Sequence, residues 1–73
     1  MKRDDVSHPA HYRVAGLECL DVIEALGLGY HLGNAFKYLW RAGRKDASRT
    51  VEDLRKARFY IDREIARRSR QAR

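Results

Sequence analysis

The chain has 73 residues, of which 44% are hydrophobic and 36% are charged, and its formal net charge is +6. This length allows one small domain and excludes a doubly wound sheet, a P-loop fold and a two-domain enzyme. Its only cysteine, Cys19, cannot form an internal disulfide, which favours a reducing compartment. Without disulfides, a chain this short usually gains stability from a metal or a second chain, and we expect a homo-oligomer.

The sequence has no run of about 18 apolar residues, the length that a membrane span needs. Residues 1–9 carry charges but no apolar stretch of the kind found in signal peptides. We therefore expect a cytoplasmic protein with no membrane partner. Residues 44–73 contain eleven of the 16 Lys and Arg residues and five of the 10 acidic residues, which accounts for the whole net charge. This basic region favours an anionic partner, although it is also typical of a solvated helix surface.

Residues 1–16 are predicted to form an irregular arm, because a proline and a glycine interrupt them and no helical period appears. A first helix is predicted over residues 17–26, where apolar and acidic residues fall on opposite sides. Gly27 is expected to end it. Cys19 lies on the apolar side, which indicates a buried thiol rather than a nucleophile.

A second helix is predicted over residues 32–44, with Phe36 and Trp40 on its apolar side as expected core residues. The other side carries a polar stripe at helical spacing, formed by Asn34, Lys37, Tyr38, Arg41 and Lys45. Two cations one turn apart, beside neutral hydrogen-bonding groups, suit a phosphate or a carboxylate. Gly33 would let the backbone approach such a ligand closely. The alternative is a solvated helix face.

A third helix is expected after residues 46–50, and Thr50 followed by Asp53 has the spacing of a capping box. A seam at alternating spacings of three and four could pack on the other helices or on a partner chain; it consists of Val51, Leu54, Arg58, Ile61 and Ile65. Residues 66–73 are predicted to be a basic, frayed tail. The predicted fold class is all-α, with three helices and an irregular N-terminal arm, completed by oligomerisation.

The arm contains two histidines, His8 and His11, and two carboxylates follow at Glu18 and Asp21. These four side chains could ligate a metal, but spacing on an irregular arm does not fix a coordination geometry. The histidines could instead hydrogen-bond helix ends, contact a phosphate or act as an acid or base. We predict no metal and no cofactor.

Four motifs in order resemble a phage-encoded family of small proteins of unknown function: His8-Pro9-x-His11-Tyr12, Gly16-x-Glu18-x-x-Asp21-x-Ile23, Gly33-Asn34-x-x-Lys37-Tyr38-x-x-Arg41-x-Gly43-x-Lys45 and Asp53-Leu54-x-Lys56-Ala57-x-x-Tyr60-Ile61. A similar segment lies within the larger nucleotide kinase of T7-like phages. The resemblance covers about residues 7–65. It implies a phage origin, a helical fold and the handling of deoxynucleoside phosphates, although the kinase members are longer than this chain.

The function expected from these observations is nucleotide binding, of the kind found in nucleotide kinases, in the cytosol of the phage's host. The expected phosphate-binding residues are Asn34, Lys37, Tyr38, Arg41, His8 and His11, with Glu18 and Asp21 orienting an imidazole. The arm would fold over the start of the second helix as a lid. Catalytic residues are not assigned. One alternative is an inhibitor of a host defence or replication protein, acting by protein binding or by nucleotide sequestration. The other is a nucleic-acid-binding module that uses the basic third helix and tail.

Overall fold

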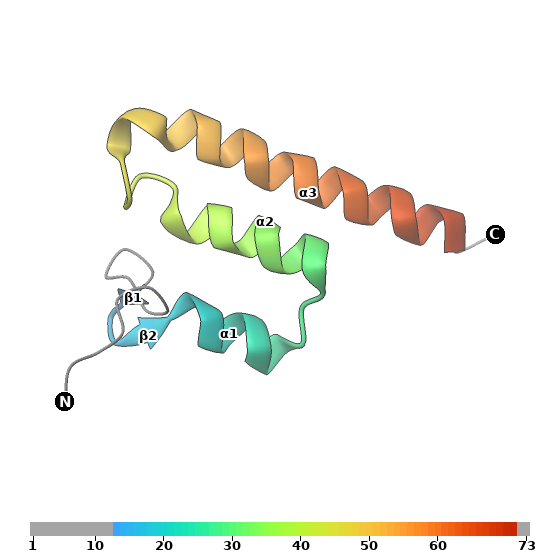
Figure 1. The fold of residues 1–73 in the computed structure, drawn as a ribbon, viewed down its shortest axis with the longest axis horizontal. Helices are drawn as coiled ribbons and strands as arrows, with labels where there is room; N and C mark the ends of the chain where they lie inside the picture. The colour runs from blue at the N-terminus through green and yellow to red at the C-terminus, as the bar shows by residue number, and fades with distance from the viewer. Residues whose placement is uncertain (1–12, 72–73) are drawn as a thin grey trace.

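The computed structural model describes residues 13–71 (Figure 1). In chain order the elements are β1 (Arg13–Val14), β2 (Leu17–Glu18), α1 (Cys19–Leu26), α2 (Tyr30–Arg41), the 3-10 helix η2 (Ala47–Arg49) and α3 (Thr50–Gln71). The three α-helices confirm the all-α, three-helix part of the predicted fold class, whereas its completion by oligomerisation stays a prediction. The short two-stranded sheet is an addition to that prediction.

The hairpin occupies the end of the segment that the sequence predicts as an irregular arm. β1 and β2 pair antiparallel, with Arg13 opposite Glu18 and Val14 opposite Leu17. The two turn residues both have positive φ, 53° at Ala15 and 79° at Gly16. Two such residues match the twist of a tight hairpin, so the chain reverses here and α1 begins at Cys19 rather than at the predicted residue 17.

Glycines set the ends of the first two helices. Gly27 has the left-handed conformation (φ 65°), and its N–H donates to the carbonyl of Glu24, which confirms the predicted end of α1. α2 begins and ends earlier than predicted, at Tyr30 and Arg41. The chain then turns through Gly43, whose φ is 81°.

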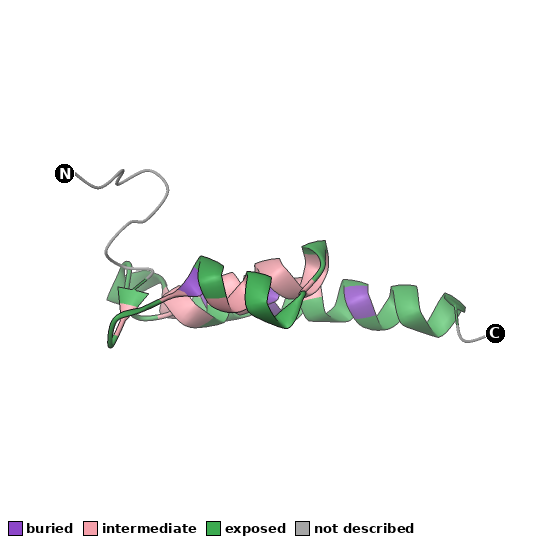
Figure 2. Cartoon of the chain, turned by 90° about the horizontal axis from the view of Figure 1, so that it is seen from below, coloured by how far each residue is buried: buried purple, intermediate pink, exposed green. Residues whose placement is uncertain are grey.

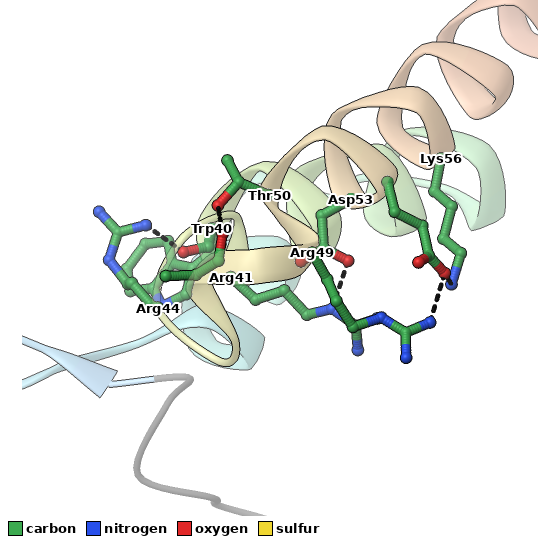
Figure 3. Close-up of polar contacts among 9 residues, drawn as sticks. Trp40, Arg41, Arg44, Arg49, Thr50, Asp53 and Lys56 are labelled. Atoms are coloured by element: carbon green, nitrogen blue, oxygen red, sulfur yellow. Dashed lines mark hydrogen bonds and ion pairs between the residues drawn. The ribbon is translucent and has the colours of Figure 1, made fainter.

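The start of α3 differs from the predicted capping box. Asp46 Oδ1 accepts hydrogen bonds from the Ser48 N–H (3.0 Å) and hydroxyl (2.7 Å), which caps η2. The Thr50 hydroxyl donates to the Ala47 carbonyl at 2.8 Å instead of capping α3. Asp53 points toward α2 (Figure 3). The capping-box prediction is therefore wrong, because each side chain has another partner.

The C-terminal part of α3 is helical as far as Gln71, so residues 66–71 do not form the predicted frayed tail. Glu64 explains the extension, because its carboxylate accepts hydrogen bonds from Arg67 and Arg68, three and four residues further on. The hydrogen bonds from Arg67, followed by that from Arg68, lower the pKa of Glu64 from its ordinary value of 4.5 to about 2.

The helices lie side by side in a single layer with α2 in the middle (Figures 1 and 2). The dimensions, 51 × 29 × 19 Å, describe a flat and elongated molecule. Among the described residues, the buried apolar side chains are Cys19, Ala35 and Ala57, which confirms the prediction for Cys19. The last turns of α3 extend past α2 (Figure 1). Over residues 13–71, no helix has both the length and the hydropathy of a membrane span.

Candidate anion-binding site

Three cations converge on the ring of Tyr38, which faces α3. Lys37 Nζ lies 4.7 Å from the ring centroid and Arg41 Cζ lies 4.6 Å from it. Lys56 Nζ, from α3, lies 5.4 Å away. Tyr60 stacks on the same ring, with the centroids 6.0 Å apart and the planes inclined by 8°. Tyr38 therefore anchors a local concentration of positive charge through cation–π contacts.

Arg41 also holds the two longest helices together. Its Nε lies 3.2 Å from Asp53 Oδ1, and the two side chains are only 14% and 5% exposed (Figure 3). The sequence places Arg41 on the polar stripe that was predicted to bind a phosphate. In the structure this guanidinium has a buried ion pair, so its first role is structural.

A polar pocket of about 320 Å³ opens where α2, the connecting turn and α3 meet. It is lined by Arg41, Lys45, Asp46, Arg49, Asp53 and Lys56. Asp53 is engaged by Arg41 and Asp46 by Ser48, so cations outnumber the carboxylates and the latter already have partners. The pocket is suited to an anion.

Glu52 positions two of these cations. Its Oε2 lies 2.6 Å from Arg49 Nη2 and 3.2 Å from Lys56 Nζ (Figure 3). The hydrogen bond from Arg49, followed by that from Lys56, lowers the pKa of Glu52. Glu52 therefore stays ionised near neutral pH and holds both side chains at the rim. Sequence patterns alone did not indicate Arg49 or Lys56 as site residues, since only the packing of α3 on α2 brings both to the polar pocket and Lys56 to Tyr38.

A second hollow, of about 350 Å³, lies between α1 and α2 on the same side of α2. It is mainly apolar and is lined by Ile23, Leu28, Gly29, Tyr30, Gly33, Asn34 and Lys37. The Asn34 amide donates to the Tyr30 carbonyl at 2.8 Å. A Cβ on Gly33 would meet Ile23 Cγ2 at 3.4 Å, so Gly33 allows α1 and α2 to pack closely.

The predicted stripe is thus shared between two sites. Asn34 and Lys37 line the hollow, Arg41 and Lys45 line the polar pocket, and the Tyr38 ring lies between Lys37 and Arg41. The four residues within α2 lie on one side of it, as their helical spacing requires, whereas Lys45 follows the end of the helix and reaches the pocket from the connecting turn.

The other predicted site residues are not brought to this region by the described part of the chain. Glu18 ends β2, Asp21 is exposed in the first turn of α1, and neither lines the pocket or the hollow. His8 and His11, and with them the lid hypothesis, lie outside the described residues. Within residues 13–71 there is no cluster of three or more His, Cys, Asp or Glu residues that could hold a metal.

Cys19 borders the same region but has the properties of a core residue. It is 3% exposed, and burial raises the pKa of its thiol, an effect that the nearby charge of Lys37 opposes. A buried thiol with a raised pKa is a poor nucleophile at neutral pH.

The fold and the site define a small helical protein with a cationic pocket on one side of a three-helix layer. Residues 6–62 match the model of a family described as protein of unknown function DUF3310, and the chain belongs to this family. It is 44% identical over 66 residues to the Gene 1.7 protein of Enterobacteria phage T3, an alignment that covers 80% of this chain and 40% of that protein. This similarity supports a phage-encoded protein. No solved structure matches the chain.

Proposed function

We propose that this protein binds a phosphate-bearing ligand, specifically a nucleotide, beside Tyr38. The observation that carries the proposal is the convergence of Lys37, Arg41 and Lys56 on one ring. Lys45 and Arg49 extend this positive charge around the polar pocket. Asp53 and Glu52 offset the charge of Arg41 and Lys56 in part. Lys37 and Lys45 have no ion pair with a described carboxylate, and a bound anion would supply their counter-charge.

The two neighbouring cavities suggest how a nucleotide would lie. Its phosphates would occupy the polar pocket, near Lys45 and Lys56, and its nucleoside would occupy the mainly apolar hollow. Tyr30 and Asn34 line that hollow, and Tyr30 is 72% exposed, so its ring is available for stacking. Such an arrangement would use the four α2 residues of the predicted stripe.

The resemblance to a segment of the nucleotide kinase of T7-like phages supports a nucleoside phosphate as the ligand. Phosphoryl transfer depends mainly on positioning and charge neutralisation, and a cationic pocket contributes to both. The chain spans 40% of the length of the phage T3 relative. We therefore propose nucleotide binding for this chain. Phosphoryl transfer is tested separately, by measuring the formation of a phosphorylated product.

Calorimetric titration and thermal-shift measurements with nucleoside mono-, di- and triphosphates test the proposal, with inorganic phosphate as a comparison. Lys45→Gln and Lys56→Gln should each weaken nucleotide binding about tenfold, because each removes a charged hydrogen-bond donor to phosphate. Arg70→Gln is the matched control: it removes one positive charge from the last turn of α3, far from the pocket. Arg41 is unsuited to this test, since its loss leaves Asp53 unpaired.

Two outcomes would contradict the proposal. Nucleotide binding that survives Lys45→Gln combined with Lys56→Gln would show that the ligand binds elsewhere. Binding that Arg70→Gln weakens equally, and that falls steeply with salt for oligonucleotides, would favour the nucleic-acid-binding alternative.

A further inference from the structure

The side of the layer opposite the polar pocket is apolar. Lys37 and Leu39 are two positions apart on α2, so their side chains point about 200° apart. Leu39 therefore lies on the other broad face, and it is 48% exposed. Lys56 marks the pocket side of α3, and the predicted seam lies on the side of α3 away from it. The apolar seam residues are Val51, Leu54, Ile61 and Ile65, which are between 37% and 59% exposed.

The isolated chain does not bury these residues, and its own core is small. The buried apolar residues of the described chain are Cys19, Ala35 and Ala57, and no side chain is both large and fully buried. The radius of gyration is 13.9 Å, whereas a compact chain of this length has about 11 Å. A single-layer domain with one apolar face open to water lacks the second layer that stable domains have.

We propose that a second copy of this chain covers the apolar face, and that the two α3 helices pack antiparallel along the seam. The seam has the three-and-four spacing of a two-stranded coiled coil and runs for about 21 Å from Val51 to Ile65. The best register sets Leu54 opposite Ile65 of the second copy. Ile61 then packs on the aliphatic part of Arg58 of the second copy. The two-fold axis crosses α3 between Arg58 and Ile61, so each contact forms twice.

Charges beside the seam match this register. Arg55 and Asp62 each follow an apolar seam residue by one position, so both lie on the same flank. In the antiparallel register Asp62 faces Arg55 of the second copy, and the symmetry forms this pair twice. Neither side chain has an ion pair with another described residue, so both are available for it. A parallel, in-register pairing would instead set Arg58 against Arg58 of the second copy and would leave Asp62 beside the uncharged Ala57.

The inference is independent of the proposed ligand. The polar pocket is on the opposite face, so each copy in the dimer keeps its pocket open to solvent, and the two pockets face outward. Loss of nucleotide binding in Lys45→Gln would leave the dimer intact, and loss of the dimer would leave the pocket residues in place.

Sedimentation equilibrium of the unmodified chain, from about 1 to about 100 µM, tests association directly. We expect a species of twice the 8.5 kDa chain mass. A folded monomer throughout this range would overturn the proposal, and so would an association that Leu54→Glu together with Ile65→Glu does not weaken. Both side chains are exposed in the single chain, so these changes leave its fold intact.

The register is tested by charge reversal. Asp62→Arg and Arg55→Asp should each raise the dimer dissociation constant about tenfold, and the double variant should return it to within about threefold of the native value. Single and double variants with equal effects would overturn the Asp62–Arg55 pairing.

Disulfide trapping gives a second test of register in a Cys19→Ala background. Leu54→Cys combined with Ile65→Cys should form a covalent dimer on mild oxidation, since these positions are opposite each other. Leu54→Cys alone should not. Efficient cross-linking by the single variant would show a parallel arrangement and overturn the antiparallel one.

Discussion

Arg41 and Asp53 form the ion pair that fixes α2 against α3, with Arg41 Nε 3.2 Å from Asp53 Oδ1 and both side chains largely shielded from water. Both members of the pair line the polar pocket (Figure 3). The Tyr38 ring also contacts Arg41. The charge that shapes the candidate site is therefore also part of what holds the helices together.

Removing one member of this pair should be strongly destabilising. Asp53→Ala leaves the Arg41 guanidinium without its buried carboxylate, and we expect the free energy of unfolding to fall by about 3 kcal/mol. Urea unfolding followed by circular dichroism at fixed chain concentration measures this loss. Arg41→Met combined with Asp53→Leu should cost less than either single change, because no unpaired charge stays buried. Additive losses in the double variant would contradict the pairing.

Glu64 should make the C-terminal half of α3 sensitive to acid. Its pKa in the folded chain is about 2, against an ordinary value of 4.5, because Arg67 and Arg68 bind its ionised form. A depressed folded pKa means that the stabilisation is fully present above about pH 4.5 and is lost as the pH falls toward 2.

We expect helicity to decline over this pH range, with a smaller decline in Glu64→Gln, which lacks the ionised partner at every pH. Carboxyl-carbon NMR should report the Glu64 titration midpoint directly. Glu24→Gln is the control, since Glu24 is an exposed carboxylate in α1, away from the α3 seam. A Glu64 midpoint near 4.5 would show that the two arginines do not bind it in solution.

The local features of this fold were predictable because they depend on neighbouring residues. Helical periodicity predicted α1 and the burial of Cys19, and Gly27 marked the end of that helix. The hairpin turn was missed because Ala15 adopts a positive φ that non-glycine residues rarely adopt, so the sequence carried no clear turn signal.

The candidate site was only half predictable. The stripe on α2 follows from helical spacing alone. The contacts of Arg41 with Asp53, and of Lys56 with Tyr38, join different helices, and they depend on the way α3 rotates about its axis. A sequence pattern identifies the apolar seam of α3 but not what packs on it, and in the single chain its apolar residues stay exposed.

Two glycines should respond in opposite ways to substitution by alanine. Gly27→Ala places a side chain at φ 65°, and should lower the free energy of unfolding by about 1 kcal/mol. Gly33 is inside α2 with an ordinary helical φ, and its added Cβ would just touch Ile23 Cγ2.

Gly33→Ala should therefore leave stability unchanged or raise it by up to about 1 kcal/mol, because alanine favours the helix. Thermal unfolding of both variants at one chain concentration provides the comparison. A large loss in Gly33→Ala would show that α1 and α2 cannot move apart by even a few tenths of an ångström.

Tyr38 provides the last prediction, because its ring and its hydroxyl can be removed separately. The ring stacks on Tyr60 and contacts Lys37, Arg41 and Lys56, whereas its hydroxyl has no hydrogen-bond partner among the described residues. Tyr38→Phe keeps every ring contact and should change the free energy of unfolding by less than about 0.5 kcal/mol. Tyr38→Leu removes the stacking and the cation–π contacts and should cost roughly 1–3 kcal/mol.

Urea unfolding in low and high salt measures the stability of both Tyr38 variants. The Leu variant should recover part of its stability in high salt, because salt screens the repulsion among the three cations. Equal losses in the two variants would assign the role of Tyr38 to its hydroxyl and would remove the ring as the centre of the cationic cluster.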